Sequence, residues 1–248
     1  MLSKARIKFI KSLQLKKYRK QEQCFVVEGG KSVLELLHSD FEVVQLLATP
    51  GFFDQNHKAL MGLAREITEV EENELAGLGV YSANNAALAI VRMKPNRAPA
   101  VNTDEFFLML DGIRDPGNLG TMLRTADWYG IKKIIASEDT GEVYNGKVIQ
   151  SSMGSFTRVN IFYTDLEQYL TKNVLPVFGT FLAGDNVHNI NFGTSGVIVI
   201  GNETNGISKE VEKFVTKRIT IPKFGNAESL NAAIATAVIC DNIRRRKS

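Results

Sequence analysis

The stretch Val197-Ile-Val-Ile-Gly-Asn-Glu-Thr-Asn-Gly-Ile-Ser208 carries the clearest signal for the fold of this chain. Its four leading apolar residues predict a short strand. Gly201 ends that strand, and its missing side chain would let a ligand or another stretch of backbone approach closely. Glu203 follows at the end of the strand, and Ser208 is placed to cap the next helix. The stretch therefore predicts a strand, a polar loop and a helix, in that order.

Short apolar runs alternate with helical patterns along the rest of the chain. The candidate strands include Cys24 to Val27, Val43 to Thr49, Phe106 to Leu110, Ile131 to Ala136, Val177 to Leu182, Val197 to Ile200 and Arg218 to Ile221. This alternation predicts α/β layers with a largely parallel sheet. The carboxyl ends of parallel strands share one edge, where ligands bind. Distinctive residues stand at or just beyond the ends of the strands of the second half at four places, namely Asp111-Gly112 with Asn118, Gly179-Thr180 within the end of their strand, Gly201 to Glu203, and Ile221-Pro222.

The segment from Leu110 to Gly130 predicts a helix that begins near this edge. Pro116 and Asn118 suit a helix start, and an apolar stripe at helical spacing follows them. The stripe consists of Leu119, Met122, Leu123 and Ala126. At about 100° per residue, Arg124 falls nearly opposite the stripe. From the residues alone, Arg124 is either an ordinary exposed arginine or part of a site, and Asn118 is either a helix cap or part of the same site.

A third polar segment, Ile219 to Cys240, places Glu228, Ser229 and Asn231 around the start of a helix. The next nine residues are nearly all small or apolar. A helix that is apolar on several faces needs burial on more than one side, so we expect it to pack against a partner subunit or a deep knot of chain as well as its own sheet. From the residues alone, Glu203 has two interpretations. It is either a site residue, which accepts hydrogen bonds from a sugar or pairs with Arg124, or a solvated loop acid.

Length and composition permit one or two globular domains. The chain has 248 residues, of which 44% are hydrophobic and 23% charged, and this balance excludes a disordered or fibrous protein. The segment Lys94 to Asp104 has two prolines, few large apolar residues and no periodicity, which predicts an interdomain linker. We therefore expect a first domain over residues 1–97 and a second over residues 98–248.

The charge is small in total and uneven in distribution. Thirty Lys and Arg against 27 Asp and Glu leave +3, which does not by itself indicate a nucleic-acid partner. The first 21 residues contain no acid and eight bases, namely Lys4, Arg6, Lys8, Lys11, Lys16, Lys17, Arg19 and Lys20, and the chain closes on Arg244-Arg-Arg-Lys247. The first segment is either a solvated helix face behind a packed stripe of Ile7, Ile10 and Leu13, or a surface that binds RNA or DNA phosphates. The clustering favours nucleic acid.

Several function classes are excluded. Cys24 and Cys240 are too few and too distant for a disulfide framework or a zinc cluster, which indicates a reducing compartment and no metal site. No apolar run approaches the roughly 20 residues of a membrane-spanning helix, and the N-terminus has charges where a signal peptide has its apolar core. We expect a cytoplasmic protein without membrane contact. The three histidines, His38, His57 and His188, have no motif context and receive no role.

Two nucleotide-binding interpretations also fail. Glu28-Gly-Gly-Lys-Ser32 resembles the end of a P-loop, but the first glycine of that motif would fall at Phe25, which is too bulky for the phosphate-wrapping turn. The glycines are therefore interpreted as a strand-to-helix turn. A dinucleotide-dependent enzyme would fit the alternating pattern, yet no G-x-G-x-x-G follows any strand.

The three polar segments together resemble the three motifs of the SpoU family, also called the TrmH family, of RNA ribose 2'-O-methyltransferases. The matching residues, in the family's order, are Asn118, Gly120 and Arg124 as N-x-G-x-x-x-R, Ile200 to Glu203 as I-G-N-E, and Ile221-Pro222 followed by Glu228 to Asn231 as E-S-L-N. The N-terminal region, with Lys17-Tyr-Arg19 and Phe25-Val-Val-Glu-Gly29, is similar to a substrate-binding domain with a fold like ribosomal protein L30e. The resemblance thus implies a C-terminal methyltransferase domain of SPOUT type behind a smaller α/β L30e-like domain.

The resemblance also implies a deep trefoil knot, a bound S-adenosylmethionine and a homodimer. It implies that the cofactor lies against backbone near Thr180, Gly201, Ile221 and Leu230. It further implies that Arg124 activates the ribose hydroxyl, with the help of Asn118, Glu203, Ser229 and Asn231. Because an arginine is normally charged, it is a poor free base, and it could instead stabilise the developing alkoxide or bind the adjacent phosphate.

The implied activity is 2'-O-methylation of a ribose in structured RNA. DNA is excluded as a substrate because it lacks the 2'-hydroxyl. The L30e-like domain favours 23S ribosomal RNA over transfer RNA, and the alternatives are a transfer RNA ribose methyltransferase or a non-catalytic ribosome-assembly factor of the same fold. The basic N-terminus would hold phosphates, so removal of residues 1–20 should weaken RNA binding and flatten its salt dependence.

Overall fold

A computed structural model describes residues 2–60, 67–80, 84–100 and 103–245. The chain divides into two compact units. The first comprises Met1–Pro95 together with Val143–Thr157, and the second comprises Asn96–Glu142 together with Arg158–Ser248. The chain therefore passes between the units three times, and the segment 143–157 groups with the first unit although it lies inside the second half of the sequence.

The first unit is built on a four-stranded sheet in the order β1-β4-β2-β3. Its elements are α1 (Lys4–Ser12), α2 (Lys16–Glu22), β1 (Cys24–Glu28), α3 (Gly30–Leu37), β2 (Val43–Ala48), α4 (Pro50–Leu60), β3 (Ile67–Glu69), α5 (Glu72–Ala76), β4 (Ala87–Arg92), α7 (Gly146–Ser152) and the 3-10 helix η1 (Ser155–Thr157). β4 runs antiparallel to both β1 and β2, and only β2 and β3 are parallel. The expected parallel sheet is thus wrong for this unit, because β4, which was not among the expected strands, lies between β1 and β2.

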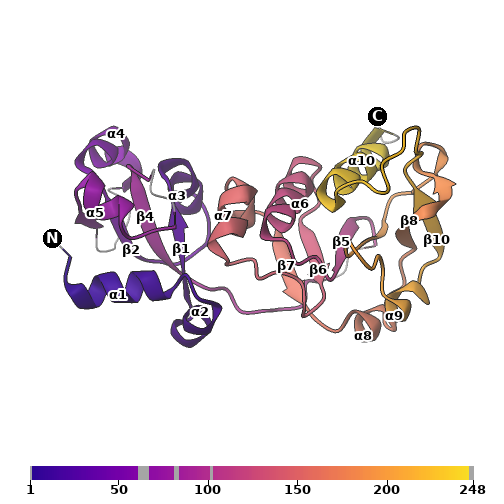
Figure 1. Cartoon of the computed structure of the whole chain (residues 1–248), viewed down its shortest axis with the longest axis horizontal. Helices are drawn as coiled ribbons and strands as arrows, with labels where there is room; N and C mark the ends of the chain where they lie inside the picture. The colour runs from indigo at the N-terminus through magenta and orange to yellow at the C-terminus, as the bar shows by residue number, and fades with distance from the viewer. Residues whose placement is uncertain (1, 61–66, 81–83, 101–102, 246–248) are drawn as a thin grey trace. The chain divides into compact units, whose positions relative to one another are not determined.

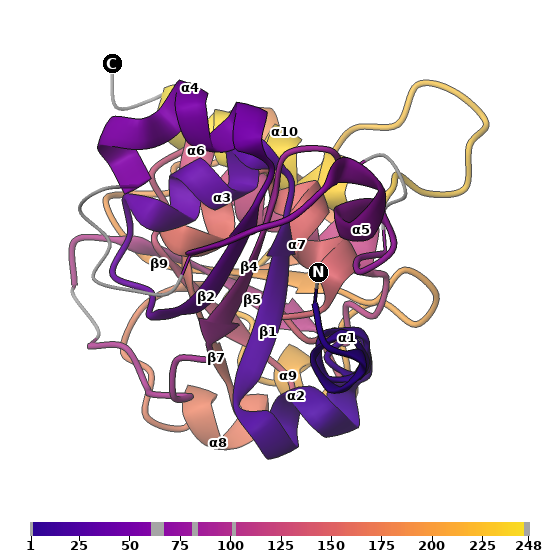
Figure 2. The ribbon, with the colours of Figure 1, turned by 90° about the vertical axis from the view of Figure 1, so that its left-hand side faces the viewer.

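Helices cover both faces of this sheet (Figures 1 and 2). Along β4, Ala87, Ala89 and Val91 pack with residues of α3, α4 and α7, whereas Leu88 and Ile90 pack with α1 and α5. This alternation follows from the two-residue side-chain period of a strand. Ile149 and Phe156 of the 143–157 segment pack on the face of the sheet that α3 and α4 cover, which explains why the segment groups with this unit.

The basic N-terminal segment forms α1 and α2, and its arginines and lysines have different environments. Arg19 is buried and donates from Nη1 to the carbonyl oxygens of Leu13 (2.9 Å) and Gln14 (2.7 Å). Arg6 is half-buried and donates from Nε to Gln45 Oε1 (2.6 Å). The remaining bases, Lys4, Lys8, Lys11, Lys16, Lys17 and Lys20, are exposed, and we call them the lysine face. Two of the eight expected phosphate ligands are therefore used inside the fold.

The second unit is built on a six-stranded sheet in the order β10-β8-β9-β5-β6-β7, and every pair in it is parallel. Its elements are β5 (Phe106–Asp111), α6 (Pro116–Trp128), β6 (Lys133–Ala136), β7 (Asn160–Tyr163), α8 (Leu166–Leu170), β8 (Val177–Asn186), the 3-10 helix η2 (Val187–Asn189), β9 (Gly196–Gly201), α9 (Lys209–Glu212), β10 (Lys217–Thr220) and α10 (Ala232–Arg245). The expected parallel sheet is confirmed for this unit.

The sheet of the second unit is also a middle layer. Phe107, Met109, Val197 and Val199 point to one face, where they pack with residues of α8 and α9. On the other side lie α6 and α10, which pack against each other (Figure 1). The apolar stripe of α6 is buried as expected, while Arg124 is exposed. No helix in the described part of the chain is long and apolar enough to cross a membrane.

The expected linker contains neither helix nor strand in its described residues 94–100 and 103–104; residues 101–102 lie outside the described part. Within it, the Asn96 side chain pairs with the backbone of Tyr163 on the edge strand β7. Asn96 Oδ1 accepts from Tyr163 N (2.9 Å), and Asn96 Nδ2 donates to Tyr163 O (2.8 Å). This pairing satisfies backbone groups that an edge strand otherwise leaves free.

Candidate active site

The ends of β5 and β9 meet at the carboxyl edge of the parallel sheet. Asp111 and Gly201 are partners in the ladder between these strands. Beyond them, Asp111 Oδ2 accepts from the backbone N of Ser208 (2.7 Å), and Asn202 Nδ2 donates to the carbonyl oxygen of Gly112 (2.7 Å). Two segments about 90 residues apart in sequence are thus joined at one edge, as the parallel sheet predicts.

The loop after β9 folds back on itself. Asn202 and Gly206 exchange two backbone hydrogen bonds of 2.9 Å, and Gly206 has a φ of +70°, which favours glycine. A Cβ atom on Gly201 would lie 2.3 Å from the Gly206 carbonyl carbon and 2.4 Å from Ile207 N. Of the two explanations for Gly201, a close ligand or a close backbone, the structure therefore supplies the second. Ser208 occupies the cap position of α9, but its side chain makes no capping hydrogen bond.

Three predicted site residues meet in a continuous hydrogen-bonded chain. Asn118 Nδ2 donates to Glu203 Oε1 (2.7 Å), and Asn231 Nδ2 donates to Asn118 Oδ1 (2.9 Å). These contacts join α6, the loop after β9 and the start of α10, and they span 85 and 113 residues of sequence. Both ends of the Asn118 amide are used, so its orientation is fixed.

The cap positions of the two helices clarify what Asn118 and Asn231 do locally. Asp115 is the cap of α6 and accepts from Asn118 N (2.7 Å), so the interpretation of Asn118 as the cap is wrong. Asn231 Oδ1 accepts from the backbone N of Ala233 (2.9 Å) and so caps α10, while its amide nitrogen reaches Asn118. Asn231 therefore serves the helix and the site with different atoms.

Within the described residues, Arg124 and Ser229 make no hydrogen bond to Asn118, Glu203 or Asn231. Arg124 is exposed on α6 and makes no hydrogen bond or ion pair with the described residues. The described chain shows no ion pair between Arg124 and Glu203, and Glu203 accepts from Asn118. Ser229 is exposed in the segment before α10 and makes no hydrogen bond within the described chain. Both side chains are accessible to a ligand.

The four residues expected near a cofactor come from β8, the end of β9 and the segment between β10 and α10. In the ladder between β8 and β10, Arg218 pairs with Gly179 and Ile219 pairs with Asp185, so residues 180–184 have no partner there. Thr180 begins this excursion, Ile221 follows β10, and Leu230 is half exposed before α10. Thr220 Oγ1 donates to the carbonyl oxygen of Leu182 (3.2 Å), and backbone groups outside a ladder, beside apolar side chains, suit an adenine ring and an amino-acid moiety. The residues present therefore fit an adenosyl cofactor.

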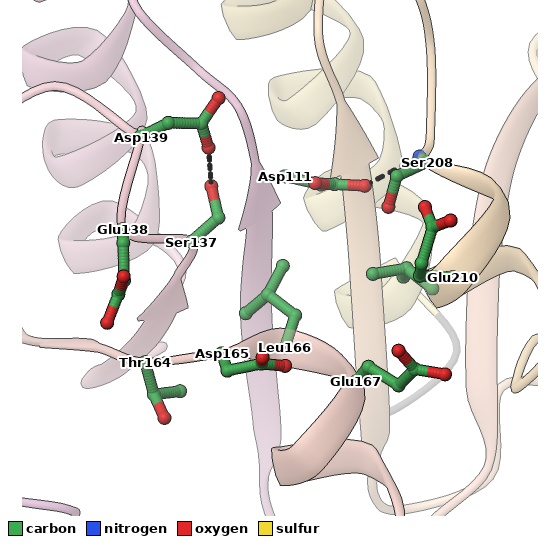
Figure 3. A pocket seen from close by; sticks show the side chains of 11 residues that line it. Asp111, Ser137, Glu138, Asp139, Thr164, Asp165, Leu166, Glu167, Ser208 and Glu210 are labelled. Carbon is green, nitrogen blue, oxygen red and sulfur yellow. Dashed lines mark hydrogen bonds between the residues drawn. The ribbon is translucent and has the colours of Figure 1, made fainter.

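A carboxylate-rich cavity of about 330 Å³ opens elsewhere along the same edge, beyond the ends of β5, β6 and β7 (Figure 3). Its lining includes Asp111, Glu138, Asp139, Asp165, Glu167 and Glu210. None of the predicted site residues lines it. Negative charge of this density repels phosphate groups, so the cavity does not fit an RNA backbone.

The loop between β5 and α6 is held by an ionised carboxylate at the rim of this cavity. Hydrogen bonds from Ser137 and from the Arg114 guanidinium lower the pKa of Asp139. Ser137 Oγ in turn accepts from the backbone N of Gly112 (2.9 Å). Asp139 thus remains charged at neutral pH and orders Gly112, whose carbonyl oxygen accepts from Asn202.

Asn202 and Asp111 were expected at the ligand-binding edge of the sheet but not among the residues of the site. Asp111 directly follows a predicted strand, and Asn202 lies inside the I-G-N-E motif, which is a usable signal. What the sequence lacks is the identity of their partners, because these are backbone atoms of distant loops.

Family models match both halves of the chain. The model described as the SpoU rRNA Methylase family matches residues 105–241, and the MRM3-like substrate binding domain matches residues 4–88. The first covers more than half of the chain, including all three polar segments.

Whole-chain relatives agree with these matches. The 23S rRNA (guanosine(2553)-2'-O)-methyltransferase RlmP of Bacillus subtilis (strain 168) is 28% identical over 253 residues, which cover 96% of each protein. A TrmH-family structure from Porphyromonas gingivalis is 36% identical with a TM-score of 0.87 and covers 99% of both chains. An AdoMet-bound rRNA methyltransferase from Sinorhizobium meliloti is 28% identical with a TM-score of 0.89, covering 99% of this chain and 96% of the other.

Proposed function

The chain belongs to the SpoU rRNA methylase family, and from this membership we propose that it methylates the 2'-oxygen of a ribose in 23S ribosomal RNA. The observation that carries the proposal is the hydrogen-bonded chain of Asn231, Asn118 and Glu203. Each of these residues comes from a different family motif, and a structural role for one motif would not require the other two. Their convergence is the expected property of one reaction site.

The proposed reaction depends mainly on how the protein positions the ribose hydroxyl relative to the methyl group. S-adenosylmethionine, when bound, supplies an already activated methyl group. The protein must orient the ribose 2'-hydroxyl, a poor nucleophile, in line with the methyl carbon and help remove the proton of that hydroxyl. We assign Arg124 to the developing alkoxide or to the adjacent phosphate, since its guanidinium is exposed and has no partner in the described chain. Glu203, held by Asn118, and Ser229 would contact the nucleotide.

The cofactor would lie against residues 180–184, the Gly201 loop and the segment from Ile221 to Leu230. Residues 180–184 have no partner in the ladder with β10, and their backbone groups, apart from the Leu182 carbonyl that accepts from Thr220, would bind the polar groups of the cofactor. Leu182 and Leu230 are exposed large apolar side chains in these segments, and they can cover the adenine.

The substrate assignment rests on the relatives and on the first unit. RlmP of Bacillus subtilis is named for 23S rRNA, and residues 4–88 match a substrate-binding domain. The lysine face supplies six exposed positive charges on two consecutive helices, which suits contact with RNA phosphates. We propose that the first unit binds RNA and that the second carries out the reaction, with the domain boundary near residues 97 and 98. The trefoil knot stays a prediction for the second unit.

We propose that the protein acts as a homodimer through α6 and α10. Trp128 on α6 is 84% exposed and Ile234 on α10 is 53% exposed, and these two helices pack against each other. Large exposed apolar side chains on two adjacent helices are typical of a subunit interface. The molar mass of Ile234→Asp by light scattering tests this. We expect a dimer for the wild type and a monomer for the variant; a monomeric wild type would contradict the proposal.

The protein would work in the cytoplasm, where its substrate is found. Cys24 and Cys240 are both buried free thiols, which suits a reducing compartment.

The experiment that tests the function is methyl transfer from labelled S-adenosylmethionine to purified RNA. We expect label in 23S ribosomal RNA from cells that lack this gene, and none in transfer RNA. Label confined to transfer RNA would overturn the substrate assignment. Absence of label in every RNA, with cofactor binding intact, would overturn the enzymatic assignment.

A further inference from the structure

Asn202 lies next to Glu203 and uses every polar group it has. Its Oδ1 accepts from the backbone N of Thr204 (2.9 Å) and of Asn205 (3.1 Å). Its Nδ2 donates to the carbonyl oxygen of Gly112 (2.7 Å), and its backbone is paired with Gly206. One side chain therefore closes the turn that carries Glu203 and also ties that turn to the end of β5.

The partner of Asn202 is itself held in place. Gly112 has a φ of +71°, and its N–H donates to Ser137 Oγ, so the direction of its carbonyl group is fixed from the other side. The loop that begins at Gly112 leads into α6, which carries Asn118. The contact between Asn202 and Gly112 thus connects the loop that carries Glu203 to the loop that leads to Asn118, which donates a hydrogen bond to Glu203.

Only an amide of this length meets both requirements. The turn needs an acceptor for two N–H groups, and Gly112 needs a donor. An aspartate would keep the acceptor and lose the donor, and a serine would keep the acceptor but be too short to reach Gly112. The residue type at position 202 therefore follows from the geometry around Glu203.

We propose that Asn202 is a positioning residue, which acts on the reaction through Glu203 and does not touch the substrate. This inference rests on the proposed function, in which Glu203 contacts the nucleotide. Asn202 would pre-organise the site, because a Glu203 carboxylate that is held in one place before the RNA binds does not have to be ordered during the reaction.

The test separates positioning from folding by means of two variants and a double-mutant cycle. Asn202→Ser keeps the turn and loses the tie to Gly112, whereas Asn202→Ala loses both. We expect both variants to lower kcat about tenfold or more, because small displacements of a reacting group are costly in rate. The KM for 23S ribosomal RNA, the dissociation constant for S-adenosylmethionine and the melting temperature should change little for Asn202→Ser.

The cycle tests the route of the effect. In a Glu203→Ala background, Asn202→Ala should change the single-turnover rate by less than twofold, because the residue it positions is gone. Asn205→Ala is the matched control. It removes an exposed asparagine from the same loop whose side chain makes no hydrogen bond within the described chain, and it should retain the wild-type kcat.

Two results would overturn the inference while the wild type remains active. One is a kcat for Asn202→Ser within twofold of wild type. The other is an equal loss from Asn202→Ala with and without Glu203, which would mean that Asn202 acts independently. A wild-type protein that transfers no methyl group to any RNA would instead overturn the proposed function itself.

Discussion

Asn118 donates a hydrogen bond of 2.7 Å from Nδ2 to Oε1 of Glu203, although 85 residues separate the two in sequence. Asn118 also accepts from Asn231, so its amide cannot rotate without losing one of the two contacts. The position of the Glu203 carboxylate is therefore set by α6 and, through Asn231, by the start of α10.

Replacing Asn118 by aspartate places two carboxylates in contact. Asn118→Asp would lose the donor to Glu203 and add a like charge at hydrogen-bond distance, while it could still accept from Asn231. We expect a larger loss of methyl transfer than for Asn118→Ala, measured as kcat on 23S ribosomal RNA. Asn189→Asp, at an exposed position, controls for the added charge and should be neutral. Equal activity of Asn118→Asp and wild type would show that the contact is irrelevant to the reaction.

Arg124 can be removed without loss of any hydrogen bond or ion pair in the described chain. Arg124→Ala should therefore leave the melting temperature and the dissociation constant of S-adenosylmethionine close to wild type. Methyl transfer should fall by about 100- to 1,000-fold or more, as when a group that stabilises developing negative charge is lost. Arg124→Lys should recover little, because a lysine cannot make a bidentate contact. Lys132→Ala, on an exposed neighbouring loop, is the control. Near-normal turnover of Arg124→Ala would remove it from the site.

The lysine face should determine the salt dependence of RNA binding. The residues Lys4, Lys8 and Lys11 lie on one face of α1, four and three residues apart. Replacing all three by alanine should weaken binding and reduce the slope of log K against log salt by about two to three. Point substitutions are preferable to removal of residues 1–20, because that truncation would also delete Ile10 and Leu13 from the core.

A matched triple substitution at Lys172, Lys209 and Lys213, which are exposed on the second unit, serves as the control and should leave the slope unchanged. If the two triple variants changed the slope equally, the lysine face would have no special role.

The pKa of the Cys240 thiol predicts how stability responds to alkaline pH. Burial raises this pKa from an ordinary 9.0 to about 12. Because the folded pKa lies above the unfolded one, the unfolded chain loses its proton first as the pH rises. The stability that the neutral thiol contributes is present below pH 9 and is lost as the pH rises from about 9 to 12. The free energy of unfolding, measured with urea between pH 8 and 11, should therefore fall more steeply with pH for wild type than for Cys240→Ala. Parallel declines would contradict this.

The sequence predicted the second unit better than the first. Its strands are short apolar runs followed by glycine or polar residues, and parallel strands bring those residues to one edge without any further information. In the first unit, β4 follows β3 by a long interval and inserts between β1 and β2, which no local pattern reveals. The grouping of residues 143–157 with that unit depends on the distant aromatic ring of Phe25, which packs against Tyr144 and Phe156.

The candidate site was predicted by residue type but not by contact. Asn118, Glu203 and Asn231 are brought together as the motifs suggested. The roles of Asn202 and of the buried Arg19 could not be predicted, because each bonds to backbone carbonyl oxygens, and side-chain identity carries no information about such partners. From the sequence, the eight clustered bases had the same expected role, and only the packing of the fold distinguished the two arginines, which bond inside it, from the exposed lysines.

The position of the transferred methyl group tests the central claim most directly. Labelled 23S ribosomal RNA is hydrolysed in alkali, which cleaves each linkage through the free 2'-hydroxyl on its 5' side and therefore spares only the linkage that follows a 2'-O-methylated ribose. With wild-type protein the label should be recovered in one alkali-resistant dinucleotide, and with Arg124→Ala it should be absent. Label recovered in mononucleotides would place the methyl group on a base and would contradict the account.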